Sequence, residues 1–341
     1  MSSGAAPGPG VSSDLASLNA ILARYKEPHL PSSIWQLVNT ALPFFTVMVL
    51  SYWTAYRGWW PLTILLAIPA SALLMRLFII QHDCGHGSFF KSARANDWVG
   101  AVIGVLTLTP YTYWKQTHAI HHSTSGNLDR RGYGDIETLT VKEYLALSKW
   151  GRLKYRMYRS VPVLFFVGPA FHFVIYHRLP WIIPSSWKAE RRSILLNDLA
   201  LAALLYYAYC TVGMKPFFLV QLSVGVFTAI AGVWLFYIQH QFEETYWSKD
   251  EKWDLVTASL KGSSYFHLPK FFQWISGNIG FHHIHHLNSR IPNYKLESCM
   301  KENPVFQNVP RLTFWSAFKC VSLTLWDEDR SRLVGFHAVP R

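Results

Sequence analysis

The hydrophobic positions of this chain gather in four long runs, at 34–56, 60–80, 194–213 and 216–238. Crossing roughly 30 Å of hydrocarbon takes about 20 apolar residues in a helix, so each run is long enough to span a membrane. Short connections at 57–58 and 214–216 join the runs in pairs. The pattern therefore predicts four transmembrane helices in two antiparallel hairpins, with Pro43 and Pro69 kinking their helices rather than ending them.

Two shorter apolar segments, 98–113 and 161–179, are interrupted by helix-breaking residues. Pro110 interrupts the first, and Pro162 with Pro169 interrupts the second. We expect both segments to lie at the membrane surface or to re-enter it, because a broken helix of this length does not cross the hydrocarbon layer on its own.

Composition and charge favour a membrane protein over a nucleic-acid-binding one. Half of the residues are hydrophobic and the formal net charge is +12. Lysine and arginine flank the apolar runs and form no stripe interleaved with polar groups, so nucleic acid is not indicated as a partner. The basic stretches at 152–159 and 178–192 are typical of loops held on the cytoplasmic side beside anionic lipid, although a solvated basic loop fits them equally well. The four cysteines show no CxxC spacing, so a disulfide framework is not expected.

Eight histidines lie in three tight clusters, whose spacing is typical of metal ligands. They are His82 and His86; His118, His121 and His122; and His282, His285 and His286. The spacings HxxxH and HxxHH place imidazoles on one side of a helix, within reach of one ion. The clusters can share metals only if they lie on one side of the membrane. Two hairpins meet this condition, whereas counting 161–179 as a span would separate the third cluster from the others.

The histidine clusters indicate a pair of metal ions. Imidazole suits iron, zinc, copper or nickel, and a set without thiolates argues against iron–sulfur clusters and structural zinc. Eight ligands are too many for one ion, so we expect two ions with open positions. Carboxylates should accept the other ring N–H groups. The candidates, which could equally be ordinary solvated acids, are Asp83, Asp129, Asp135, Glu137, Glu243 and Glu244.

Four stretches of the sequence resemble the membrane-bound acyl-lipid fatty acid desaturases, and most of all their bacterial and cyanobacterial-like Δ12 (omega-6) branch. They are HDCGHGSFF at 82–90, HAIHHSTSGNLDRRGYGDI at 118–136, QHQFEETYW at 239–247 and GNIGFHHIHHLNSRIPNY at 277–294. The resemblance covers about residues 35 to 310. It implies an all-α integral membrane protein in which four transmembrane helices and some interfacial helices carry a cytosolic cap with a di-metal site.

The resemblance also implies a cofactor and its ligands. The cofactor would be two Fe ions in a non-haem di-iron centre, with O2 as co-substrate and a separate electron donor, ferredoxin or cytochrome b5. The eight clustered histidines would be ligands, together with His240 at the end of the fourth span. The chain would divide into a disordered tail at 1–30, a desaturase domain at 31–310 and a C-terminal cytosolic extension at 311–341. The boxes would face the cytoplasm from a bacterial inner membrane or the endoplasmic reticulum.

Some residues near the motifs are predicted to have no ligand role. They are His283, off the ligand face; His172, His177 and His267, outside the clusters; and Cys84, a packing residue. Phe236 occupies a position where stearoyl-type relatives have an asparagine that holds a metal-bound water. Trp114 and Trp274 are either walls of an acyl tunnel or ordinary core and interface residues.

The predicted reaction is O2-dependent insertion of a cis double bond into a fatty acyl chain of a membrane lipid, of the Δ12 type. A methylene group has no acidic or basic atom that a side chain could recognise, so the position of the acyl chain in the protein must determine which carbon atoms react. An alternative is a hydroxylase or ketolase of lipids, carotenoids or alkanes that uses the same di-iron site. A zinc hydrolase is disfavoured because the chain has no HExxH. A metal transporter is disfavoured because its ligands would lie at mid-membrane.

Overall fold

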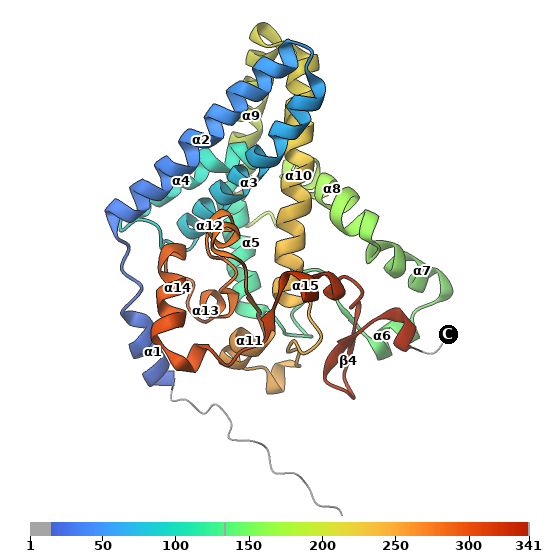
Figure 1. The fold of residues 1–341 in the computed structure, drawn as a ribbon. Helices are drawn as coiled ribbons and strands as arrows, with labels where there is room; N and C mark the ends of the chain where they lie inside the picture. The colour runs from blue at the N-terminus through green and yellow to red at the C-terminus, as the bar shows by residue number, and fades with distance from the viewer. Residues whose placement is uncertain (1–14, 133, 340–341) are drawn as a thin grey trace, which may run out of the picture.

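Four long helices stand together above a cap of short helices and strands (Figure 1). The computed structural model describes residues 15–132 and 134–339. Its long helices are α2 (Leu30–Tyr56), α3 (Trp60–Gly85), α9 (Lys188–Thr211) and α10 (Met214–His240). All four are long and apolar enough to cross a membrane, which confirms the four predicted spans.

The remaining elements are short. The other helices are α1 (Leu15–Ala23), α4 (Ala93–Leu106), α5 (Tyr111–Thr124), α6 (Val141–Ala146), α7 (Lys149–Tyr158), α8 (Gly168–Val174), α11 (Leu255–Gly262), α12 (Lys270–Ile275), α13 (His282–Leu287), α14 (Asn293–Glu302) and α15 (Phe314–Cys320). The strands are β1 (Leu139–Thr140), β2 (Tyr265–Phe266), β3 (Arg311–Leu312), β4 (Leu325–Asp327) and β5 (Arg332–Val334). Single π or 3-10 turns lie at Val163–Val167, Tyr176–Arg178, Asp250–Lys252, Pro304–Phe306 and Phe336–Ala338.

Two of the long helices continue past their apolar runs into the cap. The run at 60–80 predicted the membrane part of α3, but the helix goes on to Gly85 and carries His82 in its last turn. Likewise α10 continues beyond the run at 216–238 and ends at His240. Both helices therefore deliver histidines from the membrane boundary directly into the cap.

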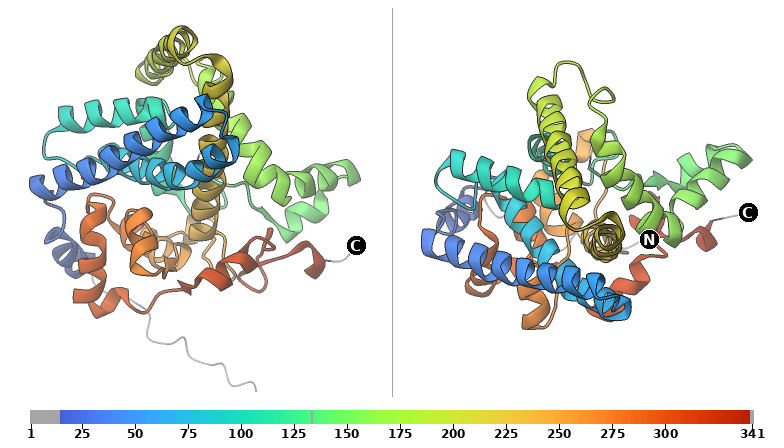
Figure 2. Two further views of the ribbon diagram at one scale, coloured as in Figure 1. Left: turned by 45° about the horizontal axis from the view of Figure 1, so that its top comes forward. Right: turned by 90° about the horizontal axis from the view of Figure 1, so that it is seen from above.

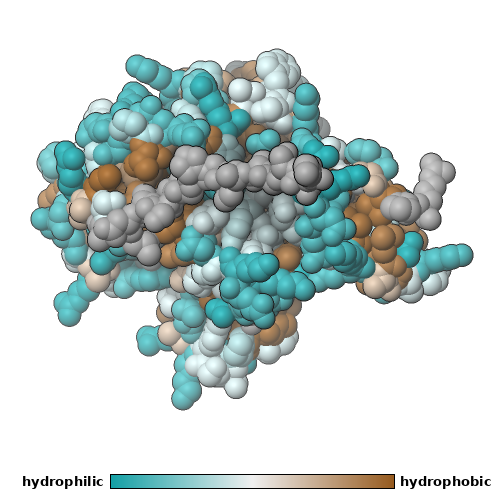
Figure 3. Space-filling model, turned by 90° about the horizontal axis from the view of Figure 1, so that it is seen from below, coloured by the Kyte–Doolittle hydropathy of each residue, from teal (hydrophilic) through white to brown (hydrophobic). Residues whose placement is uncertain are grey.

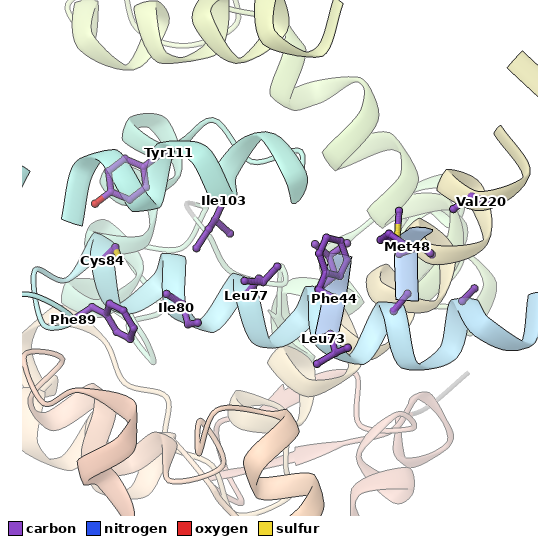
Figure 4. Close-up of a cluster of buried hydrophobic side chains, with 14 of the residues drawn as sticks. Phe44, Met48, Leu73, Leu77, Ile80, Cys84, Phe89, Ile103, Tyr111 and Val220 are labelled. Carbon is purple, nitrogen blue, oxygen red and sulfur yellow. The ribbon is translucent and has the colours of Figure 1, made fainter. Parts of the chain in front are cut away.

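The two hairpins pack differently. The α2–α3 pair shares a core with α4 and α10, in which Phe44, Leu77 and Ile103 are buried (Figure 4). In contrast, α9 packs mainly on α5 and α4, and the views in Figure 2 place it away from α2. The turn between α9 and α10 is Val212 and Gly213, with φ of +83° at Gly213, so Met214–Pro216 starts α10 rather than forming the predicted connection.

Of the two interrupted apolar segments, the first is broken at Pro110 as predicted, whereas the second stays helical through Pro169 and is broken only before Val163. In the first, α4 ends at Leu106 and Pro110 caps the start of α5. The second is a π turn followed by α8, and it meets α7 at a bend of 58°. By length and composition this bent pair is either a broken span or a re-entrant loop.

Both ends of the chain are more firmly built into the cap than the sequence suggested. Residues 15–23, assigned to the disordered tail, form α1, and Leu18 and Leu22 are buried one turn apart against residues of α11, α13 and α14. The C-terminal segment adds β3 beside β2, and it adds β4 parallel to β1 and antiparallel to β5. The described part of this segment thus packs into the cap, and residues 1–14 lie outside the described residues.

Candidate metal centre

The three histidine boxes (82–86, 118–122 and 282–286) come from three helices that end or lie in the cap. His82 is in the last turn of α3 and His86 is its C-cap residue. The second box lies on α5 and the third on α13. The structure brings all eight box histidines and His240 into two groups, within each of which the ligand atoms lie no more than 4.8 Å apart.

The membership of the two groups cuts across the boxes. The five-histidine group contains His82, His86, His118, His122 and His285. The four-histidine group contains His121, His240, His282 and His286. In the second and third boxes the two residues four apart share a group and the middle one joins the other group. Positions three and four residues from one anchor lie on opposite sides of it around a helix, so one box can serve two ions.

The spacing of the ring nitrogens suits metal coordination. The Nε2 atoms of His122 and His285 are 3.0 Å apart, and those of His240 and His282 are 2.9 Å apart. Two imidazole nitrogens at about 2.1 Å from one ion and at right angles to each other would be about 3.0 Å apart. The Nε2 atoms of His86 and His286 are buried and have no hydrogen-bond partner among the residues that the structure describes. Buried polar atoms rarely stay unpaired, so these donors fit a bound ion.

The two groups lie side by side. The rings of His122 and His286, one from each group, stack with centroids 4.1 Å apart. His240 is 3.2 Å from His121 between Nε2 atoms, so the end of α10 closes the four-histidine group. Two adjacent metal ions are the arrangement that this donor set can hold.

Of the six candidate carboxylates, two contact a box histidine. Asp135 accepts from Nδ1 of His121 at 2.6 Å, and Asp83 lies 3.4 Å from Nδ1 of His82. The other four are engaged elsewhere or exposed: Asp129 accepts from the Asp250 amide, Glu243 pairs with Arg332, and Glu137 and Glu244 contact no box histidine in the part of the chain that the structure describes.

Three further groups support the boxes, and of these the sequence had singled out only Trp114, as a tunnel wall or a core residue. Asn293 donates to Oδ2 of Asp83 from its backbone at 2.7 Å and from its side chain at 2.9 Å. The Gly262 carbonyl lies 3.2 Å from Nδ1 of His240. The indole of Trp114 stacks on His118 with an interplanar angle of 17°, so it is a wall of the metal centre. Asn293 lies within the quoted stretch at 277–294, which is the one sequence signal that could have pointed to it.

The other residues near the boxes that the sequence analysis did not assign as ligands lie outside both histidine groups. Nε2 of His283 faces the Phe306 carbonyl, and His172 packs on His177. Cys84 is buried in the core, and Phe236 contacts the rings of His121 and His240. His267 is exposed, and Trp274 stacks on Arg76.

Burial keeps the imidazoles neutral. It lowers the pKa of His285 and His286 well below the ordinary value, and neighbouring histidines add to this effect. Burial acts in the same direction on the pKa of His118 and His122. A neutral imidazole offers a lone pair to a metal without first losing a proton, so the groups are ready to bind cations at neutral pH.

Comparison with known proteins agrees with this geometry. The model of the fatty acid desaturase family matches residues 57–315. The chain belongs to the fatty acid desaturase family. A fatty acid desaturase of Bacillus subtilis (strain 168) is 42% identical over 93% of this chain and 90% of its own length. An endoplasmic reticulum omega-3 fatty acid desaturase of Vigna radiata is 30% identical over 78% of this chain and 68% of its own. An sn-1 oleoyl-lipid 12-desaturase of Anabaena variabilis is 26% identical over 81% and 80%.

As a member of the fatty acid desaturase family, the protein is an oxidoreductase that desaturates fatty acids. Its four candidate spans make it a multi-pass membrane protein. The names of its relatives include both omega-3 and 12-desaturases, so family membership alone leaves the position of the double bond open.

Proposed function

We propose that this desaturase introduces a cis double bond of the Δ12 (omega-6) type into a fatty acyl chain of a membrane lipid, with two iron ions held by its nine clustered histidines. The observation that carries the proposal is the convergence of nine imidazoles, from the ends of α3 and α10 and from the short helices α5 and α13, into two adjacent groups. When bound, a non-haem iron pair supplies the O2-dependent oxidising power needed to remove two hydrogen atoms from unactivated methylenes.

The donor chemistry is compatible with iron. Each group consists of imidazoles without a thiolate, which suits iron and other borderline metals. The five-histidine group would be His82, His86, His118, His122 and His285 around one ion; His121, His240, His282 and His286 would hold the other.

The protein's own part in the reaction is positioning. Asp135 fixes the tautomer and ring orientation of His121, and Asp83 does the same more loosely for His82. Trp114 stacks on the face of the His118 ring, and Phe236 contacts the rings of His121 and His240, so both aromatic side chains restrict the orientations of these imidazoles. The carbon atoms that react are then chosen by where the apolar surroundings hold the fatty acyl chain of the substrate relative to the ions.

Substrate and donor are inferred from the relatives. The Anabaena relative is named for an oleoyl lipid, and an sn-1 acyl-lipid omega-3 desaturase of Synechocystis, 26% identical over 88% of this chain, is named with ferredoxin. For this chain we infer an acyl-lipid substrate and a separate electron carrier, ferredoxin or cytochrome b5. The basic net charge suits an acidic carrier.

The cap is inferred to face the cytoplasm of a bacterial inner membrane or of the endoplasmic reticulum. Exposed aromatic residues lie next to lysines on three short helices that border the cap: Trp150 on α7, Phe271 on α12 and Trp315 on α15. Such pairs suit a lipid–water boundary with anionic headgroups. The far face of the cap, seen from below in Figure 3, is mostly hydrophilic with separate apolar patches.

Expression in a host that makes only monounsaturated lipids tests the proposal. Gas chromatography of fatty acid methyl esters should show a new diunsaturated product with a bond at Δ12, and His121→Ala should abolish it while the protein stays in the membrane. The matched control is His267→Ala, because His267 is exposed and outside both groups. A hydroxylated or ketone product, or unchanged lipids with a competent reductant present, would contradict the proposal.

A further inference from the structure

We propose that one face of α3, formed by Arg76, Ile79 and Asp83, sets the spacing between the first and third histidine boxes and is therefore a positioning element of the metal centre. The inference rests on the proposed function, because it assumes that the two boxes share an ion. It assigns a role to residues that are not ligands.

The three residues form one stripe on α3. Positions separated by three and by seven residues lie on the same side of a helix. Each of the three contacts a different point of the segment 274–293, which carries the third box. The contacts are thus spread over two turns of α3, so they fix both the position of this segment along the helix and its orientation around it.

Arg76 makes the first contact. Its side chain is 5% exposed, its Nη1 donates to the Trp274 carbonyl, and its guanidinium lies 4.2 Å from the centre of the Trp274 ring. Its Nε donates to the Thr40 hydroxyl of α2 at 3.0 Å. No carboxylate pairs with Arg76 among the described residues. A charged group buried on a membrane helix is costly, and here its hydrogen bonds and its ring contact join α3 to α2 and to α12.

Ile79 makes the second contact, against the turn between α12 and α13. Gly277 has a φ of +54° and Asn278 a φ of +57°. A Cβ atom at Gly277 would lie 2.7 Å from Cγ2 of Ile79, closer than side-chain atoms approach one another. The turn therefore needs glycine both for its left-handed backbone and for its close approach to α3.

Asp83 makes the third contact, through its two hydrogen bonds from Asn293 at the start of α14. Asn293 in turn accepts from the Gln36 side chain of α2 at 2.8 Å, and its carbonyl accepts from the Asn278 side chain at 3.2 Å. These buried, satisfied bonds hold the end of the third-box segment at the turn of α3 that carries His82.

The three residues of the stripe affect the distance between His285 and the two histidines of the first box. His285 of the third box has ring centroids 4.4 Å from His82 and 4.9 Å from His86, both of which extend from the end of the same α3. A shift of the Trp274–Gly277 turn along α3 would move His285 relative to that pair. The five-histidine group would then lose its common centre, whereas the backbone fold of α3 and of the cap would remain.

A double-mutant cycle at the second contact tests the inference. Gly277→Ala should weaken binding of one iron by about 10-fold or more, in the range found when residues behind metal ligands are changed. Adding Ile79→Ala removes the clashing Cγ2 and should restore part of that affinity, although the strained φ remains. The matched control is Gly58→Ala, because Gly58 also has a positive φ, +75°, and an added methyl group there meets no atom within 4 Å.

The measurements are made on the purified full-length protein. Anaerobic Fe(II) titration gives the affinity and number of ions, and thermal melting of the same samples reports folding. The expected result is about 10-fold or more weaker binding of one iron in Gly277→Ala without loss of folded protein, partly reversed in the double variant. Full binding of two ions by Gly277→Ala, or the same loss in both variants, would overturn the inference. Failure of the unmodified protein to bind iron would instead overturn the proposed function.

A second variant guards against a folding defect. Arg76→Lys keeps the positive charge but loses the planar fork that reaches Trp274 and Thr40 together. Arg76→Lys should also lower the affinity for one iron while the protein still melts as a folded protein. Equal iron affinity in Arg76→Lys and in the unmodified protein would contradict the role given to Arg76.

Discussion

The two histidine groups differ in both ligand number and exposure. The four-histidine group is buried at all four of its members. In the five-histidine group His86, His118 and His122 are only partly buried. The group with more ligands is thus the more accessible one, and the group with fewer ligands is sealed by the end of α10 and by the third box.

The supports of the two groups differ as well. His121 of the four-histidine group has a short 2.6 Å contact with Asp135, whereas His82 of the five-histidine group lies 3.4 Å from Asp83. A cavity of about 10 Å³, room for about one water molecule, lies between His240 and Asp135. The buried four-histidine group therefore has fewer ligands, and one of them makes a short contact with a carboxylate. The more exposed five-histidine group has one ligand more and a longer carboxylate contact.

The largest expected effect comes from removing one ligand of each group. His282→Ala leaves three imidazoles in the four-histidine group, whereas His86→Ala leaves four in the other. Losing a partner behind a ligand typically costs 10–100-fold in metal affinity, so losing a ligand of the smaller group should cost at least about 100-fold. Iron content and product yield of both variants measure this, and a greater loss in His86→Ala would break the comparison.

The next effect concerns the carboxylates. Asp135→Asn should weaken metal binding by about 10–100-fold, because His121 loses its charged acceptor. Asp83→Asn should cost less, since Asp83 is farther from its histidine and is mainly engaged by Asn293. Fe(II) titration of the two variants side by side decides between them, and an equal or reversed order would contradict the difference in support.

Acidification should destabilise the metal-free protein. Because burial lowers the pKa of His282, His285 and His286, the unfolded chain takes up protons that the folded chain does not. Stability from these residues is fully present above pH 6.5 and is lost as the pH falls from there towards their lowered pKa values, at about 1.4 kcal/mol per pH unit for each. Melting curves of chelated protein between pH 7.5 and 5.5 test the sign, and higher stability at pH 5.5 would contradict it.

The smallest effect is expected at Trp114. Trp114→Phe keeps an aromatic face against His118 but reduces the stacked area, and such contacts contribute about 0.5–1.5 kcal/mol. The iron affinity of the five-histidine group should fall less than about 10-fold, as an Fe(II) titration can measure. A complete loss of one ion would show that the indole does more than pack.

Sequence alone predicted the parts that rest on local pattern. The four spans follow from long apolar runs, and the eight box histidines meet as their spacing suggested. His240, which only the family resemblance placed with them, lies in the four-histidine group. How the boxes divide between two groups was not predictable, because it depends on the relative orientation of α5 and α13. The same is true of Asn293 and Gly277, whose roles arise from contacts with α3. Burial of Leu18 and Leu22 was also hidden, since their partners lie more than 200 residues later.

The most direct test of the account is the metal content and spectroscopy of purified, active protein. The account predicts two iron ions per chain with a coupled binuclear signal, and loss of that signal in His282→Ala together with loss of the unsaturated product. Active protein with a single ion, or with two ions that show no coupling, would contradict the claim that the nine histidines hold an adjacent pair.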